Sequence, residues 1–163
     1  MKTLDDLYKL INKENIVLDE NWNASSDLSG IYVKLPSCPP VIAINKSIKD
    51  RKKLCSIISE ELGHYYTTYG DLTDQEGKNK KVQAIKMENR AKKWAADFLM
   101  SDEELMQALM NCISNRCDLC EYFNATDELL KYKLCSILED ENKYNDIKNK
   151  LKMHEVAYSA CEI

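Results

Sequence analysis

Three side chains near the middle of the chain, Glu60, Glu61 and His64, have the types and spacing of a metal-binding helix. Residues four apart lie on one face of a helix, so Glu60 and His64 could bind a divalent ion together. Glu61 projects from the same side and could reach a water molecule on that ion. The spacing is that of the zinc-binding pattern H-E-x-x-H with glutamate in its first position, and it predicts metal-assisted hydrolysis.

A further acidic residue, Glu88, is the candidate for a third ligand and lies on a second predicted helix. Helical periodicity places it within an apolar face made of Ala84, Ile85, Ala91, Ala95 and Leu99. A buried carboxylate without a partner is costly, so Glu88 is expected to face a cation or a strong donor. With Glu60 and His64 it would form a three-ligand site that keeps a fourth position for water. The alternative is an ordinary ion pair between Glu88 and a lysine.

Two long helices should carry these side chains, one over 48–69 and one over 82–100, with a polar loop at 70–81 between them. The first helix has one broad apolar face, formed by Leu54, Cys55, Ile58, Leu62, Tyr65 and Tyr66. These tyrosines and Trp94 are expected in the core rather than in contact with a substrate. The small residues Ala91 and Ala95 would let the backbones of the two helices approach closely.

The remaining elements are short, and they predict an α+β fold that is predominantly α. Thr3 should cap a helix over 3–12, and strands are expected at 16–18, 30–35 and 41–44. The last two strands flank a turn-rich stretch and predict an antiparallel pair, and the sheet as a whole is expected to be short and antiparallel. Helices should follow at 101–113, behind a capping box at Ser101, and at 116–123, 127–138 and 143–153. The expected organisation is a core over 1–100 with a helical subdomain over 101–163, packed as one compact unit.

The composition favours a protein of the cytoplasm. Seven cysteines, an acidic N-terminal segment and the lack of a run of about 18 to 20 apolar residues predict reduced thiols, no secretory signal and no membrane span. The net charge of −4 argues against direct binding of nucleic acid.

Two features near the C-terminus allow other functions. Cys117 and Cys120 form a C-x-x-C pair, which we interpret as small buried residues because no second pair accompanies it. The segment 117–134 resembles a helix-turn-helix, whose second helix would offer Lys131 and Lys133 to phosphates among several acids. A structural or substrate-docking role is the preferred interpretation, and a DNA-binding accessory protein is the rival. The other histidine, His154, is expected on the surface.

The segments 39–45, 58–68 and 88–95 together resemble the ImmA/IrrE family of metallopeptidases, which are associated with phages and mobile elements. The specific part is EELGHYYT, followed across a polar loop by ExxAxxWA. The resemblance implies a zincin-like fold, with His64 and Glu88 as metal ligands and Glu61 as general base. It also implies one divalent ion, zinc first of all, and a helix-turn-helix repressor as the protein that is cleaved.

The first ligand position departs from the family pattern, because Glu60 stands where the family normally has histidine. Two glutamates and one histidine make a harder, more anionic site, for which Mn²⁺ or Fe²⁺ become possible alternatives to Zn²⁺. The added negative charge should also make a bound water less acidic. The rival hypothesis is therefore a catalytically inactive relative that binds a repressor or another partner without cutting it.

Overall fold

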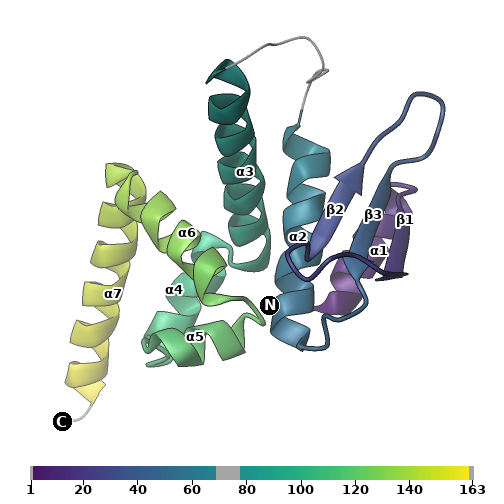
Figure 1. The fold of residues 1–163 in the computed structure, drawn as a ribbon. Helices are drawn as coiled ribbons and strands as arrows, with labels where there is room; N and C mark the ends of the chain where they lie inside the picture. Colours follow the sequence, from purple (N-terminus) through teal and green to yellow (C-terminus); the bar gives the residue numbers. More distant parts are fainter. Residues whose placement is uncertain (1, 69–77, 162–163) are drawn as a thin grey trace.

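The computed structural model describes residues 2–68 and 78–161, which contain seven helices and a three-stranded sheet (Figure 1). The elements in chain order are α1 (Leu4–Lys13), β1 (Val17–Trp22), β2 (Gly30–Val33), β3 (Val41–Asn45), α2 (Arg51–Thr67), α3 (Lys78–Leu99), α4 (Asp102–Met110), α5 (Arg116–Tyr122), α6 (Asp127–Leu138) and α7 (Glu141–Cys161). The predicted α+β class with predominant helix is confirmed. None of these helices is long and apolar enough to cross a bilayer.

The sheet is mixed, with the strand order β1-β3-β2. The predicted antiparallel pair is confirmed, with Gly30 opposite Ile44 and Val33 opposite Val41. The prediction of a wholly antiparallel sheet is wrong, because β1 pairs parallel to β3, with Val17 opposite Val41. The chain turns back between β1 and β2, and β3 then occupies the central position, so β3 runs in the same direction as β1.

One face of the sheet packs on α1 and α2. The capping box at Thr3 begins α1, and alternate residues of β3 point to the helices, as Ile42 and Ile44 are almost fully buried. This first core contains Leu7, Ile11, Ile16, Ile42, Ile44, Cys55, Ile57, Ile58 and Leu62. It holds α2 against the sheet and thereby determines which side of α2 stays outside the core.

Helices α2 and α3 lie side by side in the middle of the molecule (Figure 1). The predicted close approach is confirmed, since Ala91 and Ala95 are fully buried. Helix α3 begins at Lys78, so the prediction of a loop as far as residue 81 is wrong at its end, and residues 69–77 of that region lie outside the described residues. On the same helix pair, Tyr66 stacks on Trp94 with ring centroids 4.8 Å apart, and these aromatics pack against the core as predicted.

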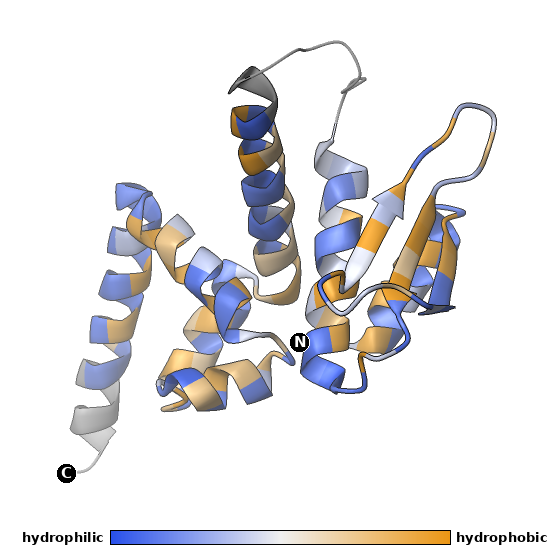
Figure 2. Ribbon diagram, in the orientation of Figure 1, coloured by the Kyte–Doolittle hydropathy of each residue, from blue (hydrophilic) through white to orange (hydrophobic). Residues whose placement is uncertain are grey.

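A second core joins the C-terminal half of α3 to α4, α5 and α6, where apolar residues gather (Figure 2). The predicted capping box at Ser101 is present at the start of α4. Helix α7 is mostly hydrophilic and packs on this unit, with Ile147 against the core and Lys143 paired with Asp102. The sheet and α7 therefore lie at opposite ends of the molecule, with α2 and α3 between them (Figure 1).

The cysteines are more exposed than the sequence suggested. Cys55 and Cys120 are buried, but Cys38, Cys112, Cys117 and Cys135 are exposed, and these six are free thiols. The interpretation of the C-x-x-C pair as two buried residues is wrong for Cys117. The first turn of α5 faces solvent there, because only its later residues reach the core. His154 is exposed, as predicted.

Candidate metal centre

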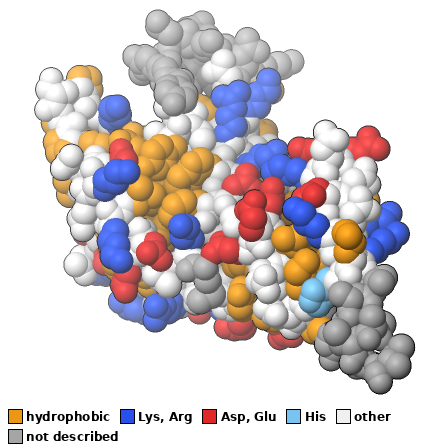
Figure 3. Space-filling model, turned by 180° about the vertical axis from the view of Figure 1, so that it is seen from behind, with side chains coloured by type: hydrophobic (Ala, Val, Ile, Leu, Met, Phe, Trp, Pro, Cys, Tyr) orange, Lys and Arg blue, Asp and Glu red, His pale blue; other side chains and the backbone are white. Residues whose placement is uncertain are grey.

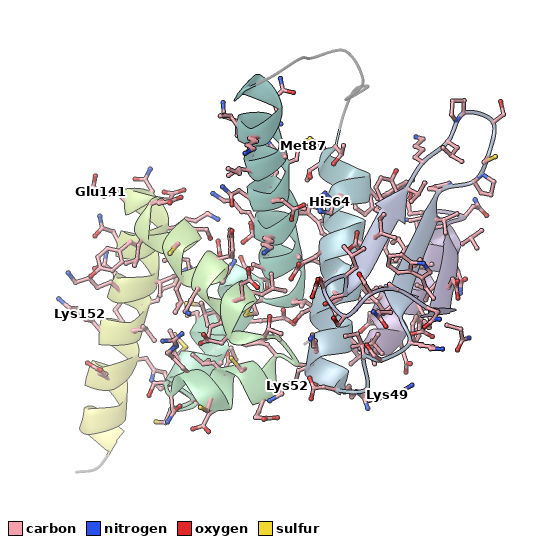
Figure 4. The ribbon with its side chains drawn as sticks, in the orientation of Figure 1. Lys49, Lys52, His64, Met87, Glu141 and Lys152 are labelled. Carbon is pink, nitrogen blue, oxygen red and sulfur yellow. The ribbon has the colours of Figure 1, made fainter. Side chains whose placement is uncertain are left out.

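A cavity of about 1000 Å³ lies between α2, α3 and the segment 27–36, which contains β2. Four of the residues that line it are those predicted from the sequence: Glu60, Glu61, His64 and Glu88. The first three come from consecutive turns of α2 and the last from α3. In Figure 4, His64 projects from α2 toward α3. The structure thus brings the predicted residues to one cavity.

His64 and Glu88 are the pair that comes closest across the two helices. His64 Nε2 lies 3.4 Å from Glu88 Oε1, and the His64 side chain is 18% exposed. Burial lowers the pKa of His64; the Glu88 carboxylate opposes this shift and the charge of Lys92 adds to it. The imidazole is therefore held toward its neutral form, which is the form that binds metal ions.

Glu88 itself is not buried, which corrects the expectation from helical periodicity. Its side chain is 56% exposed, and Ile85 on the preceding turn is also exposed. Among the described side chains of α3, Ala91 is the first that is buried, and the part of the helix before it borders the open cavity. The argument from a buried carboxylate therefore fails, and the case for Glu88 rests on its position beside His64.

Glu60 is half-buried and Glu61 is buried, and the pKa of each is raised. Burial raises the pKa of Glu60 to about 7, although the charge of Lys92 acts in the opposite direction. Burial also raises the pKa of Glu61 to about 8, and the charges of Glu60 and Glu88 raise it further, while the backbone N–H of Tyr32 lowers it. Carboxylates in such surroundings are stabilised by a nearby cation.

A glycine in β2 allows the sheet to approach Glu61. A Cβ atom at Gly30 would lie 2.6 Å from Ile57 Cγ2 and 2.9 Å from Glu61 Oε1. Real side chains do not come so close, so the strand can cover Glu61 only because residue 30 has none. The segment from Asp27 to Pro36, which the sequence analysis did not assign to the site, forms this wall of the cavity.

Lys92 is a site residue that the sequence analysis missed. It lines the cavity from α3, one turn beyond Glu88, and its side chain is 20% exposed. Its ammonium donates a hydrogen bond to Glu128 of α6 and lies 5.9 Å from the centre of the Tyr132 ring. The four-residue spacing from Glu88 was the signal that could have found it.

The donor set fits a divalent ion in its chemistry. Two carboxylates and a neutral imidazole are ordinary ligands for zinc, manganese or iron. The cavity is also lined by more acidic side chains than lysines. Over residues 2–68 and 78–161, no three Asp, Glu, His or Cys side chains are gathered closely enough to hold an ion as they stand. His64 and Glu88 are already together, and Glu60 faces the same cavity one turn away on α2.

A comparison with known proteins identifies the family of this chain. A family model described as the IrrE N-terminal-like domain of Peptidase M78 matches residues 8–135, a stretch that includes all four candidate residues. Searches of curated proteins and of solved structures give no match. Because the family model spans most of the chain, this protein belongs to the Peptidase M78, or ImmA/IrrE, family of metallopeptidases.

Proposed function

We propose that this protein is a metal-dependent endopeptidase that cleaves a partner protein, and that Zn²⁺ is its metal, with Mn²⁺ or Fe²⁺ as alternatives. The observation that carries the proposal is the convergence of Glu60, Glu61, His64 and Glu88 on one cavity in a chain of this family. By resemblance, the partner is a helix-turn-helix repressor of a phage or mobile element, met in the cytoplasm.

The residues divide into ligands and a base. Glu60, His64 and Glu88 would hold the ion, which supplies a Lewis acid and makes a water molecule more acidic. Glu61 would take a proton from the attacking water and pass it to the leaving nitrogen, as a C–O bond forms and the peptide C–N bond breaks. With its pKa raised to about 8, Glu61 needs a nearby cation to be ionised at neutral pH and so to act as a base.

A polypeptide substrate is supported by the strand beside the cavity. Within the described residues β2 pairs only with β3, so no strand covers its other edge, and Gly30, Ile31 and Tyr32 line the cavity. An extended segment could add to such an edge through backbone hydrogen bonds. A peptide held there would cross the cavity that contains Glu61.

The alternative is an inactive family member that binds its partner without cutting it. One observation favours it: glutamate stands at position 60, where the family normally has histidine. The intact base at Glu61 favours the enzyme, since an inactive relative has no need of it.

Metal content separates these possibilities. We would measure zinc, manganese and iron by mass spectrometry in protein purified without chelators, and compare it with His64→Ala and Glu88→Ala. The expected result is about one equivalent in the native chain and a loss in both variants, while Glu61→Gln keeps the metal. A native chain that stays metal-free after soaking at neutral pH contradicts the proposed enzyme.

Cleavage of a repressor encoded beside this chain is the second test. Glu61→Gln should hold the metal and leave the repressor intact. If the variant relieves repression as well as the native chain does, the inactive binding protein is the correct reading.

A DNA-binding role receives little support from the α5–α6 pair. Lys133, which the sequence analysis placed on the surface, is 1% exposed and pairs with Asp97 and Asp102. Lys131 pairs with Asp127, which also accepts a hydrogen bond from Arg116. Acidic and basic side chains are also interspersed on the face seen in Figure 3. We expect no salt-dependent retention on DNA, and retention at low salt would revive this function.

A further inference from the structure

A peptidase of the proposed kind needs a donor for the oxygen that becomes negative when water attacks the carbonyl. The tyrosines next to the α2 motif do not meet this need. Tyr65 donates its hydroxyl to Glu14, Tyr66 packs on Trp94, and neither lines the cavity. The donor must therefore come from another element.

The cation that lines the cavity beside the candidate ligands is Lys92. It lies on α3 one turn after Glu88 and therefore on the same side of the helix. Its side chain is 20% exposed and lines the same cavity as Glu60 and His64. Lys34 also lines the cavity, but it is exposed at the end of β2.

The Lys92 ammonium is held in place from the other side. Glu128, at the start of α6, accepts its hydrogen bond, and the Tyr132 ring lies beneath it at 5.9 Å. Tyr132 in turn donates to Asn89, 2.8 Å away, which ties α6 to α3 next to Glu88. An ammonium has three N–H donors, and within the described residues its hydrogen bond is to Glu128. Donors therefore remain for a group bound in the cavity.

We propose that Lys92 is a catalytic residue whose ammonium donates a hydrogen bond to the oxyanion formed on the scissile carbonyl. This inference rests on the proposed peptidase function. The attacking water forms the C–O bond, the carbonyl π electrons move to its oxygen, and Lys92 stabilises that charge without transferring its proton. Glu61 carries the water proton to the leaving nitrogen as the C–N bond breaks. The α6 contacts make Lys92 a preorganised donor, which is the property that such a role requires.

The test compares Lys92→Met with the native chain, both loaded with Zn²⁺. The substrate probe is a library of tryptic peptides from a bacterial proteome, with cleavage followed by mass spectrometry. For the best-cleaved sequence we expect kcat to fall by about 10²- to 10³-fold and KM to change little, the usual loss for one oxyanion donor. Lys93→Met is the matched control, because Lys93 is the exposed neighbour, and it should cleave at the native rate.

Binding provides a readout that does not depend on turnover. A phosphonamidate of the cleaved sequence mimics the tetrahedral anion, and its Kd should weaken in Lys92→Met by the same factor as kcat. The Kd of the product peptide and the zinc content should not change. Glu128→Ala keeps the lysine but removes the acceptor that anchors it, and it should show a smaller loss of the same kind.

The outcomes distinguish this inference from the proposed function. Native-like kcat in zinc-loaded Lys92→Met, or equal weakening of analogue and product, would refute the catalytic role of Lys92 and leave the peptidase intact. A zinc-loaded native chain that cleaves neither the neighbouring repressor nor any peptide of the library contradicts the peptidase, and the role of Lys92 falls with it.

Discussion

The α-carbon of Gly63 faces the backbone of Ala91 so closely that a Cβ atom on Gly63 would lie 2.3 Å from the Ala91 carbonyl oxygen. This contact joins α2 to α3 next to His64, whose Nε2 atom lies 3.4 Å from Glu88 Oε1. Because Gly63 has no Cβ atom, α2 and α3 can approach closely enough to bring His64 and Glu88 together.

Gly63→Ala should therefore force the helices apart. We expect the free energy of unfolding to fall by about 1 to 3 kcal/mol, even though alanine favours helix by about 1 kcal/mol over glycine. Urea denaturation measures the loss, and metal affinity should fall with it. The contact is with backbone, so adding Ala91→Gly should not restore stability; a rescue by that second substitution would contradict the explanation.

The buried acids make the stability of the metal-free protein depend on pH. The folded-state pKa values of Glu60 and Glu61, about 7 and 8, lie above the ordinary value of 4.5. Between pH 4.5 and 8 the folded chain keeps protons that the unfolded chain releases, so raising the pH should favour unfolding, by roughly 1.4 kcal/mol for each unit of pKa shift.

Urea denaturation of chelator-treated protein at pH 5, 6, 7 and 8 tests this dependence. Glu61→Gln should remove most of the slope, and Glu60→Gln part of it. The exposed acid Glu103, changed to Gln, is the matched control and should leave the slope as it is. Stabilisation by added zinc should grow with pH, because metal ions and protons compete for the same groups. Equal slopes in the native chain and in Glu61→Gln would contradict the raised pKa of Glu61.

Lys133 should act as an ionic link between helices. It is 1% exposed, and its ammonium lies 2.7 Å from Asp97 and 2.5 Å from Asp102, on α3 and α4. Lys133→Met would leave both carboxylates without this partner, and we expect a loss of about 2 to 4 kcal/mol in equilibrium unfolding. Lys143→Met, which removes a half-exposed partner of Asp102, should cost less than about 1 kcal/mol. Equal losses in the two variants would mean that burial adds nothing.

Asn45 holds the wall of the cavity that precedes β2. It is 4% exposed, and its side-chain amide donates to the backbone oxygens of Leu28, at 2.8 Å, and Ser25, at 3.1 Å. Asn45→Asp keeps the shape but has no N–H to donate, so we expect a loss of about 1 to 3 kcal/mol.

Hydrogen exchange locates the effect of this substitution. Protection should fall at Leu28 before it falls elsewhere, because its backbone N–H belongs to the loop that Asn45 holds. The exposed Asn21→Asp serves as control and should stay within about 0.5 kcal/mol of the native chain. Unchanged protection in the loop would show that Asn45 does not hold it.

Local signals in the sequence were sufficient for most elements. Capping boxes at Thr3 and Ser101 begin α1 and α4 where predicted, and helical periodicity identified the apolar face of α2. These features depend on residues within one or two turns of each other, and so they can be read from the chain directly. The same regularity put Glu60, Glu61 and His64 on one side of α2, where all three meet the cavity. Their roles in that site, and a domain boundary near residue 100, stay predictions.

Tertiary structure alone decided burial and charge partners. Glu88 is exposed because α3 borders a cavity there, and Lys133 is buried because two other helices close over it. The parallel pairing of β1 depends on which strand takes the centre of the sheet. The acceptor that anchors Lys92, Glu128, comes from α6 and is therefore known only from the tertiary structure. Burial, strand pairing and charge partners all depend on how segments that are distant in the sequence pack together. The periodicity within one segment carries no information about this packing.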